Sequence, residues 1–308
     1  MVMKKVFWII LCMFFILPVI FAENMKLHYE RPAEYFEEAL VIGNGTMGAT
    51  LYGGVKKDKI SFNDITLWTG EPESENSSPD AFNAIPEIRA LLDNEDYQGA
   101  DKAQYKVQGH YSENYQPLGT LTIEYLDDTV GISDYHRWLD IGNATARTQY
   151  LKGGKLFTSD YFASAPDSVI VIRLKSENKE GIHALLSFDS PLPHSSQVAD
   201  NEISVEGYAA YHSFPVYYKA EDKHRYDPER GIHFKTLVRV LSVDGRVKNR
   251  YSDSRIEIDG STEVLIWVAN VTSFNGFDKD PVKEGRNYRS HVEKRMKCAI
   301  GKTYDALR

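Results

Sequence analysis

Short apolar segments of strand length recur along most of this chain, and turns rich in glycine, asparagine or proline separate them. Such a pattern is typical of antiparallel strands joined by tight turns, because glycine and asparagine accept the positive φ angles that these turns require. It extends over roughly 240 residues, which is within the range of one large domain. The pattern predicts a large antiparallel two-sheet β-sandwich. Clear examples of the segments are residues 135–141, 144–151, 156–163 and 169–175.

Two stretches instead show the 3.6-residue period of helices. Residues 81–107 predict a small helical insertion of one or two helices, broken near Asn94, whose plain role is to pack over an edge of the sandwich. Residues 282–300 predict a C-terminal linker helix that Gly301 ends. The change of period places a boundary near Asp280, so residues 23–280 are expected to form the sandwich domain. The apolar side of the C-terminal helix consists of Tyr288, Val292, Met296 and Ala299.

The first 22 residues have the layout of a secretory signal peptide. Lys4 and Lys5 precede an apolar run at residues 6–17, and Pro18 breaks the run before Ala22. The run is short for a membrane span, so no membrane segment is expected after cleavage. The sequence therefore predicts a protein that is exported to the periplasm or the extracellular space.

Composition excludes some classes of partner. The 308 residues carry a formal net charge of −8, which argues against nucleic acid as a ligand and fits neutral ligands. The charged loop at residues 219–229 contains Asp222, His224 and Asp227, but their spacing is not that of metal ligands. We expect neither a metal site nor a cofactor.

Residues 39–72 contain the strongest candidate for a binding site. Two loops there, Gly43-Asn44-Gly45 and residues 63–68, combine amide and carboxylate groups with an aromatic ring. Such groups can hydrogen-bond the hydroxyls of a sugar and pack against its face. Spacing alone favours a plain β-meander, in which Asn63 and Asp64 cap a turn and Trp68 fills a domain interface. The candidate residues for a substrate pocket or a domain interface are Asn44, Asn63, Asp64, Trp68, Tyr115 and Gln116.

The same stretch resembles the opening of glycoside hydrolase family 95, which comprises α-L-fucosidases and some α-L-galactosidases. The resemblance rests on A-L-x-I-G-N-G-x-x-G-A from Ala39, G-G-V from Gly53 and N-[DE]-x-T-L-W-[ST]-G-x-P from Asn63. The family often has proline where Val41 stands and aspartate where Thr120 stands. Three further blocks match, namely Y-Q-P-x-G from Tyr115, R-x-L-D from Arg137 and F-A-S-x-P-D-x-V-I-V-I-R-L from Phe162.

The resemblance covers only the N-terminal domain of that family. It implies that a full-length protein hydrolyses terminal α-linked L-fucose from glycans with inversion, and that the catalytic groups lie on a helical (α/α)₆ barrel that follows the sandwich. Residues 281–308 would begin the linker to that barrel, which is missing here. No residue of this chain matches a catalytic position, so none is assigned and the chain alone is expected to be inactive. Its expected partners are a fucosylated glycan and the helical catalytic domain. A free-standing carbohydrate-binding module and a purely structural sandwich remain alternatives.

Overall fold

A computed structural model describes residues 25–73, 80–109, 112–127 and 130–308. The signal peptide predicted at residues 1–22 lies outside these ranges. No helix within them combines the length and the hydropathy that a membrane span requires.

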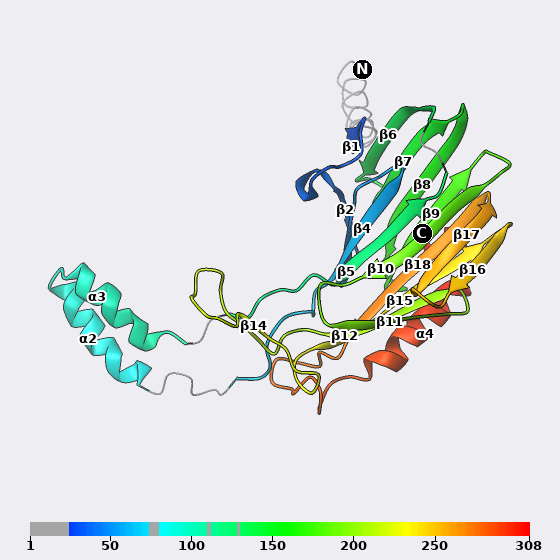
Figure 1. The fold of residues 1–308 in the computed structure, drawn as a ribbon. Helices are drawn as coiled ribbons and strands as arrows, with labels where there is room; N and C mark the ends of the chain where they lie inside the picture. Colours follow the sequence, from blue (N-terminus) through cyan, green and yellow to red (C-terminus); the bar gives the residue numbers. More distant parts are fainter. Residues whose placement is uncertain (1–24, 74–79, 110–111, 128–129) are drawn as a thin grey trace, which may run out of the picture.

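Two large antiparallel sheets form a sandwich, as predicted (Figure 1). The nine-stranded sheet has the order β1 (Lys26–Tyr29), β6 (Ile132–Asp140), β7 (Thr145–Lys152), β8 (Lys155–Ser164), β9 (Val169–Ser176), β18 (Glu263–Thr272), β15 (His233–Ser242), β12 (Glu202–Tyr208) and β11 (His194–Ala199). The seven-stranded sheet has the order β16 (Arg246–Arg250), β17 (Arg255–Ser261), β10 (Ile182–Asp189), β5 (Gly119–Tyr125), β4 (Lys57–Asp64), β3 (Met47–Leu51) and β2 (Leu40–Gly43). A small hairpin pairs β13 (His212–Ser213) with β14 (His224–Arg225).

The strands bury side chains according to how many of their faces are covered. β4 alternates between exposed or half-buried residues and buried ones, because only one of its faces is turned to the core. β9 instead buries four consecutive residues, Val169 to Ile172. Ile170 and Ile172 belong to the core between the sheets, whereas Val169 and Val171 belong to a second apolar cluster with the C-terminal helix. The continuous apolar run is thus explained by layers on both faces of this strand.

The C-terminal helix α4 (Tyr288–Ile300) forms the second of these layers. The predicted apolar side is confirmed, since all four of its residues are buried. The helix begins six residues later than predicted, because the Asn287 side chain caps it by accepting a hydrogen bond from the Ser290 backbone N–H. A short helix, α5 (Tyr304–Leu307), follows. The role of residues 281–308 as a linker to a further domain stays a prediction.

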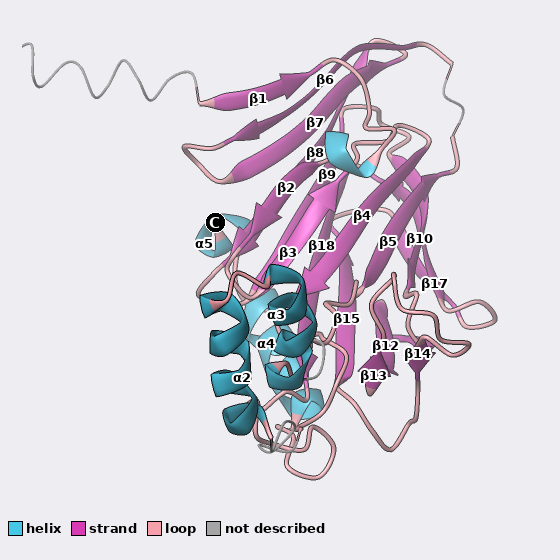
Figure 2. Cartoon of the chain, turned by 90° about the vertical axis from the view of Figure 1, so that its left-hand side faces the viewer, coloured by secondary structure: helices cyan, strands magenta, loops and turns pink. Residues whose placement is uncertain are grey.

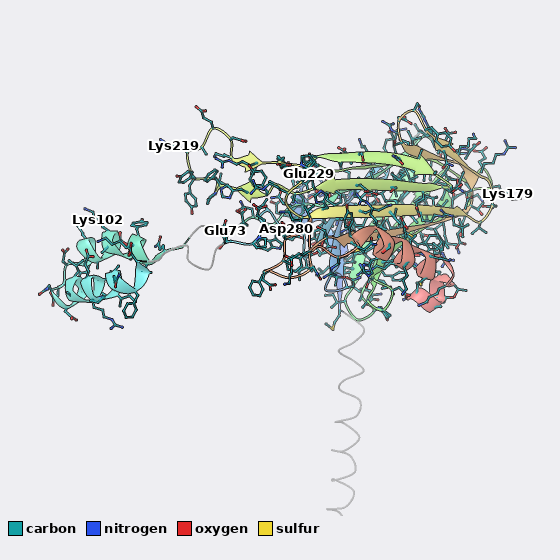
Figure 3. The ribbon with its side chains drawn as sticks, turned by 90° about the horizontal axis from the view of Figure 1, so that it is seen from below. Glu73, Lys102, Lys179, Lys219, Glu229 and Asp280 are labelled. Carbon is teal, nitrogen blue, oxygen red and sulfur yellow. The ribbon has the colours of Figure 1, made fainter. Side chains whose placement is uncertain are left out.

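The helical insertion is confirmed as α2 (Ala81–Asp93), α3 (Tyr97–Ala103) and the 3₁₀ turn η2 (Gln104–Val107), with the break at Asn94. The expectation that it packs over an edge of the sandwich is wrong. Figures 1 and 3 show the helices standing away from both sheets. The insertion buries only small side chains between its own helices, and the large ring of Phe82 is 81% exposed. Pro86 lies inside α2 rather than in its first turn.

Candidate functional site

All six predicted site residues lie at one end of the sandwich, which we call the loop end. The register pairs Met47 with Asp64 and Phe62 with Gly119, so the β2–β3 turn, the end of β4 and the start of β5 are neighbours. Figure 3 shows Glu73, Lys219, Glu229 and Asp280 toward this end, and Lys179 at the opposite one. We call the opposite end the far end. The helices α2 and α3, seen in front of the sheets in Figure 2, connect to the loop end.

Asn44 fixes the β2–β3 turn. Its side-chain oxygen accepts hydrogen bonds from the backbone N–H of Thr46 at 3.1 Å and of Met47 at 2.9 Å. Its amide nitrogen donates to the carbonyl of Ser164 at 3.0 Å, which links this turn to the other sheet. Both ends of the amide are therefore engaged, and the role of Asn44 in this arrangement is to position the turn.

Asp64 is buried at the end of β4 and joins the two sheets. One carboxylate oxygen accepts from the Thr66 backbone N–H at 2.9 Å, and the other accepts from the Asn270 side chain at 2.9 Å. Asn270 lies on β18 and in turn accepts from the Thr236 hydroxyl on β15 at 2.8 Å. The neighbouring Asn63 is exposed, with its oxygen close to the Cα hydrogens of Gly48. Asp64 is thus a positioning residue, and Asn63 is the accessible one of the pair.

Trp68 and Tyr115 form an aromatic pair at the surface. They are joined by an isolated β-bridge, and their rings meet edge to face at 5.5 Å. The indole N–H donates to the Ile65 carbonyl at 3.0 Å, which fixes the ring although 42% of the residue is exposed. Burial, followed by the charge of Asp64, raises the pKa of Tyr115 to about 12. Gln116 is buried beside the pair, and its backbone N–H donates to the Leu67 carbonyl.

A groove of about 250 Å³ runs beside Trp68. Two segments that are distant in the sequence line it, residues 65–72 with Trp68 and residues 274–281 with Phe277. Phe277 is 89% exposed. Two carboxylates line it, but each has a basic partner. Glu71 pairs with Arg230, and Glu113 pairs with His212 at 2.8 Å. The groove therefore offers aromatic surface and hydrogen-bonding groups, and neither carboxylate is free for acid–base chemistry.

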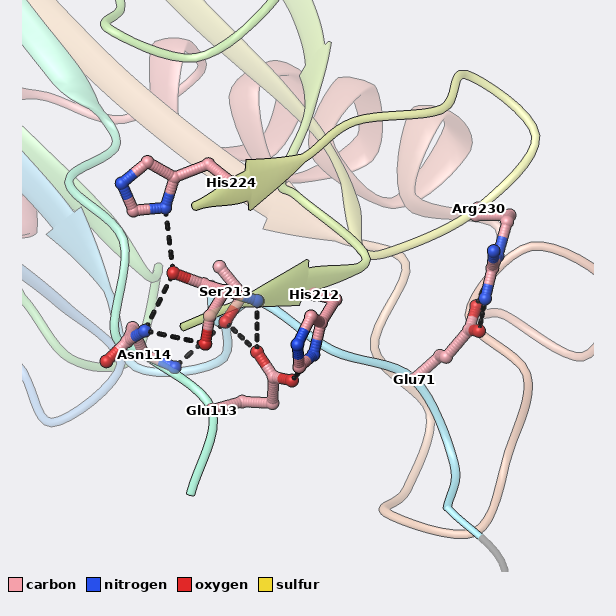
Figure 4. A network of polar contacts seen from close by, with 8 residues as sticks. Glu71, Glu113, Asn114, His212, Ser213, His224 and Arg230 are labelled. Atoms are coloured by element: carbon pink, nitrogen blue, oxygen red, sulfur yellow. Dashed lines mark hydrogen bonds and ion pairs between the residues drawn. The ribbon is translucent and has the colours of Figure 1, made fainter. Parts of the chain in front are cut away.

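A polar network holds the β13–β14 hairpin against this groove (Figure 4). Glu113 accepts from the Ser213 backbone N–H at 3.0 Å and from the Thr69 hydroxyl. Asn114 donates to the Ser213 hydroxyl, which lies 2.7 Å from His224 Nδ1. Ser213 is buried, and its hydroxyl contacts both Asn114 and His224. The Ser213–His224 contact therefore stabilises the hairpin and does not form an activated nucleophile.

Sequence analysis did not identify this network. Glu113 and His212 are 99 positions apart, and no local spacing connects them. Only the pairing of the two loops in space reveals the contact. Within the described part of the loop end, no group of histidine, cysteine and acidic residues has metal-binding geometry.

Comparisons with known proteins place the chain among glycoside hydrolases. A family model described as "Glycosyl hydrolase family 65, N-terminal domain" matches residues 27–276. The chain is 29% identical over 284 residues to "Alpha-L-fucosidase 2" of Arabidopsis thaliana, an alignment that covers 88% of this chain and 34% of that protein. It is 24% identical to "Probable alpha-fucosidase A" of Aspergillus oryzae and 27% identical to the protein of the same name in Aspergillus niger, with 88% and 94% of this chain covered.

The chain spans about a third of the length of these relatives, with 34%, 37% and 36% covered. A solved structure, "Putative kojibiose phosphorylase from human microbiome", superimposes with a TM-score of 0.50 at 10% identity, covering 93% of this chain and 37% of that one. That likeness concerns the fold alone. The resemblance to the N-terminal domain of the fucosidases, drawn from the motifs, is confirmed. The chain belongs to the family of glycosyl hydrolase family 65 N-terminal domains.

Proposed function

We propose that this chain is the non-catalytic sandwich of an exported α-L-fucosidase, and that its loop end closes one side of the substrate pocket formed with a helical catalytic domain. The observation that carries the proposal is that all six motif residues lie at the loop end, where Trp68 lines a groove and Trp68 and Phe277 stay exposed. Polar and aromatic side chains in loops, held by a rigid scaffold, are typical of binding and catalytic surfaces.

The loop-end residues divide into two groups under this proposal. Asn44 and Asp64 use their polar atoms within the domain, so they position the loops. Trp68, Tyr115 and Asn63 present accessible surface, so they are the residues that meet a glycan or the catalytic domain. An apolar wall of this kind contributes orientation and exclusion of water, while the inverting reaction needs two unpaired carboxyl groups roughly 6.5–9.5 Å apart. Those two groups would come from the catalytic domain.

The proposal is tested with the chain alone and with a chimera. In the chimera, residues 25–308 replace the matching region of the plant relative. A second protein is the same plant relative without that region. We expect no release of fucose by the chain alone, and clear hydrolysis of 4-nitrophenyl α-L-fucoside by the chimera. Fucose release by the chain alone, or equal activity of the chimera and the protein without a sandwich, would contradict the proposal.

A second candidate function is a free-standing carbohydrate-binding module. It is favoured by the groove itself, in which the exposed rings of Trp68 and Phe277 stand beside carboxylates. Calorimetric titration of the isolated chain with fucosyl oligosaccharides distinguishes the two functions. Binding that Trp68→Ala abolishes would support the module, whereas the enzyme proposal expects weak or no binding by the chain alone.

A further inference from the structure

A surface cluster of metal-ligand side chains lies at the strand pair β1–β6, at one edge of the nine-stranded sheet. His28, Glu30 and His136 each offer one ligand atom, and these three atoms lie within 4.8 Å of one another. His28 and Glu30 are exposed and His136 is half-buried. This cluster has no part in the proposed function of the loop end.

The sheet itself sets the geometry of the cluster. His28 lies on β1, and Glu30 lies in the bend directly after the strand, two positions further on. The register pairs His28 with Trp138 and Tyr29 with Arg137, so Glu30 and His136 are the next residues along the two chains. Two ligands therefore come from one chain segment and one from its neighbour, without any rearrangement of the backbone.

The distance between the imidazoles matches a shared metal ion. His28 Nε2 lies 3.2 Å from His136 Nδ1. In a tetrahedral zinc site with Zn–N bonds of 2.0–2.1 Å, two nitrogen ligands are separated by about 3.3 Å. Without a metal this contact is a hydrogen bond between the two rings, and the described residues offer neither imidazole another hydrogen-bond partner, so binding an ion would break no other hydrogen bond of the rings. The exposed Glu30 can close the remaining distance by a change of rotamer.

We propose that His28, Glu30 and His136 bind a divalent transition-metal ion of the zinc class, with a water molecule completing the coordination. Two imidazoles and a carboxylate are ligands that suit Zn²⁺, and the surface position leaves the fourth place open to solvent. The ion fastens β1 to β6. All four residues of β1 are exposed, and among the described strands β1 pairs only with β6, so the metal adds a cross-link to this ladder and to the Lys26–Asp140 ion pair.

The experiment uses the chain without a histidine tag, freed of metal with EDTA and then titrated with Zn²⁺. Calorimetry is expected to give one Zn²⁺ per chain with a roughly micromolar Kd. Hydrogen exchange is expected to slow at the amides of residues 26–30 when Zn²⁺ is added. The ion then holds β1 to β6 through side chains, in addition to the backbone hydrogen bonds. His28→Gln and His136→Gln should each weaken binding at least about tenfold, since even outer partners of metal ligands contribute that much.

His183→Gln is the matched control. His183 is also partly exposed and lies 3.2 Å from a carboxylate, that of Asp259, but it has no second histidine beside it. Its loss should leave Zn²⁺ affinity unchanged. All variants are compared for unfolding in EDTA, where they should match the unsubstituted chain. Absence of Zn²⁺ uptake at about 100 μM, or the same uptake when both His28 and His136 are replaced, would overturn the proposal.

Discussion

The strand β4 buries a carboxylate at each of its ends, in different surroundings. At the loop end, Asp64 accepts hydrogen bonds from Thr66 and Asn270 and so connects two loops and two sheets. At the far end, Asp58 accepts from the Tyr161 hydroxyl at 2.7 Å and the Gly54 N–H at 2.9 Å. Burial raises the pKa of Asp58 to about 6 despite these bonds. At the loop end, side-chain contacts thus hold loops in place. At the far end, burial shifts Asp58 toward its protonated form.

Turn chemistry shows the same difference. At the far end, the turns at Gly181 and Gly245 approach the backbone of Gly260 so closely that a Cβ on either would lie within 2.6 Å of it. Both glycines also have positive φ. The role of these turns is to reverse the chain direction. The loop end instead presents Trp68, Tyr115 and the groove. The contrast fits the proposal that the loop end contacts a ligand or a further domain, while the far end serves the fold.

The largest expected effect concerns Asp58 and pH. Its pKa is about 6 in the folded chain and near 3.8 when unfolded, so the folded state binds the proton more tightly. Its contribution to stability is therefore full below about pH 4 and is lost as pH rises through 6, a change of about 3 kcal/mol. Asp58→Asn mimics the protonated acid. Urea unfolding should show the variant gaining about 2.4 kcal/mol on the unsubstituted chain between pH 4 and pH 7; a constant difference would contradict the assignment.

Asp64→Ala should cost roughly 2–3 kcal/mol of unfolding free energy, because the buried Asn270 side chain and the Thr66 N–H lose their acceptor. Asn63→Ala is the matched control, since its side chain is exposed on the adjacent position, and it should cost below about 0.5 kcal/mol. Both are measured by urea unfolding at pH 7. Equal losses for the two variants would show that Asp64 does not join the sheets as described.

Gly181→Ala should cost about 2 kcal/mol, because the new Cβ meets the backbone of Gly260 and φ is +76°. Gly153→Ala tests strain alone, since φ there is +57° but nothing lies within 4 Å of the added atom. It should cost about 1 kcal/mol. If both variants lose the same stability in thermal unfolding, close backbone approach is not what organises the far end.

The architecture was largely predictable, because it depends on local periodicity. Repeated strand-length runs predicted the sandwich, and helical spacing predicted α2, α3 and the buried side of α4. The strand β11 was not predicted, and it is an edge strand in which only Val198 is buried. Its polar residues leave no apolar period to detect.

The candidate site was predictable in its residues but not in its connections. The six motif residues do lie together, because the turns that carry them follow paired strands. Which of them are accessible could not be predicted, since the buried Asp64 bonds Asn270, which is 206 positions away. The Glu113 network likewise joins residues 99 positions apart. Such contacts follow from tertiary packing and leave no local pattern.

The most direct test of the account is the catalytic efficiency of Trp68→Ala in the chimera with the plant relative. The far-end control is Val243→Ala, which also truncates an exposed apolar side chain. We predict that Trp68→Ala lowers kcat/KM for the fucoside roughly tenfold, equivalent to about 1.4 kcal/mol, while its unfolding free energy stays within about 1 kcal/mol of the parent. Val243→Ala should change neither quantity. Equal kcat/KM for the two variants and the parent would contradict the claim that the loop end serves the substrate pocket.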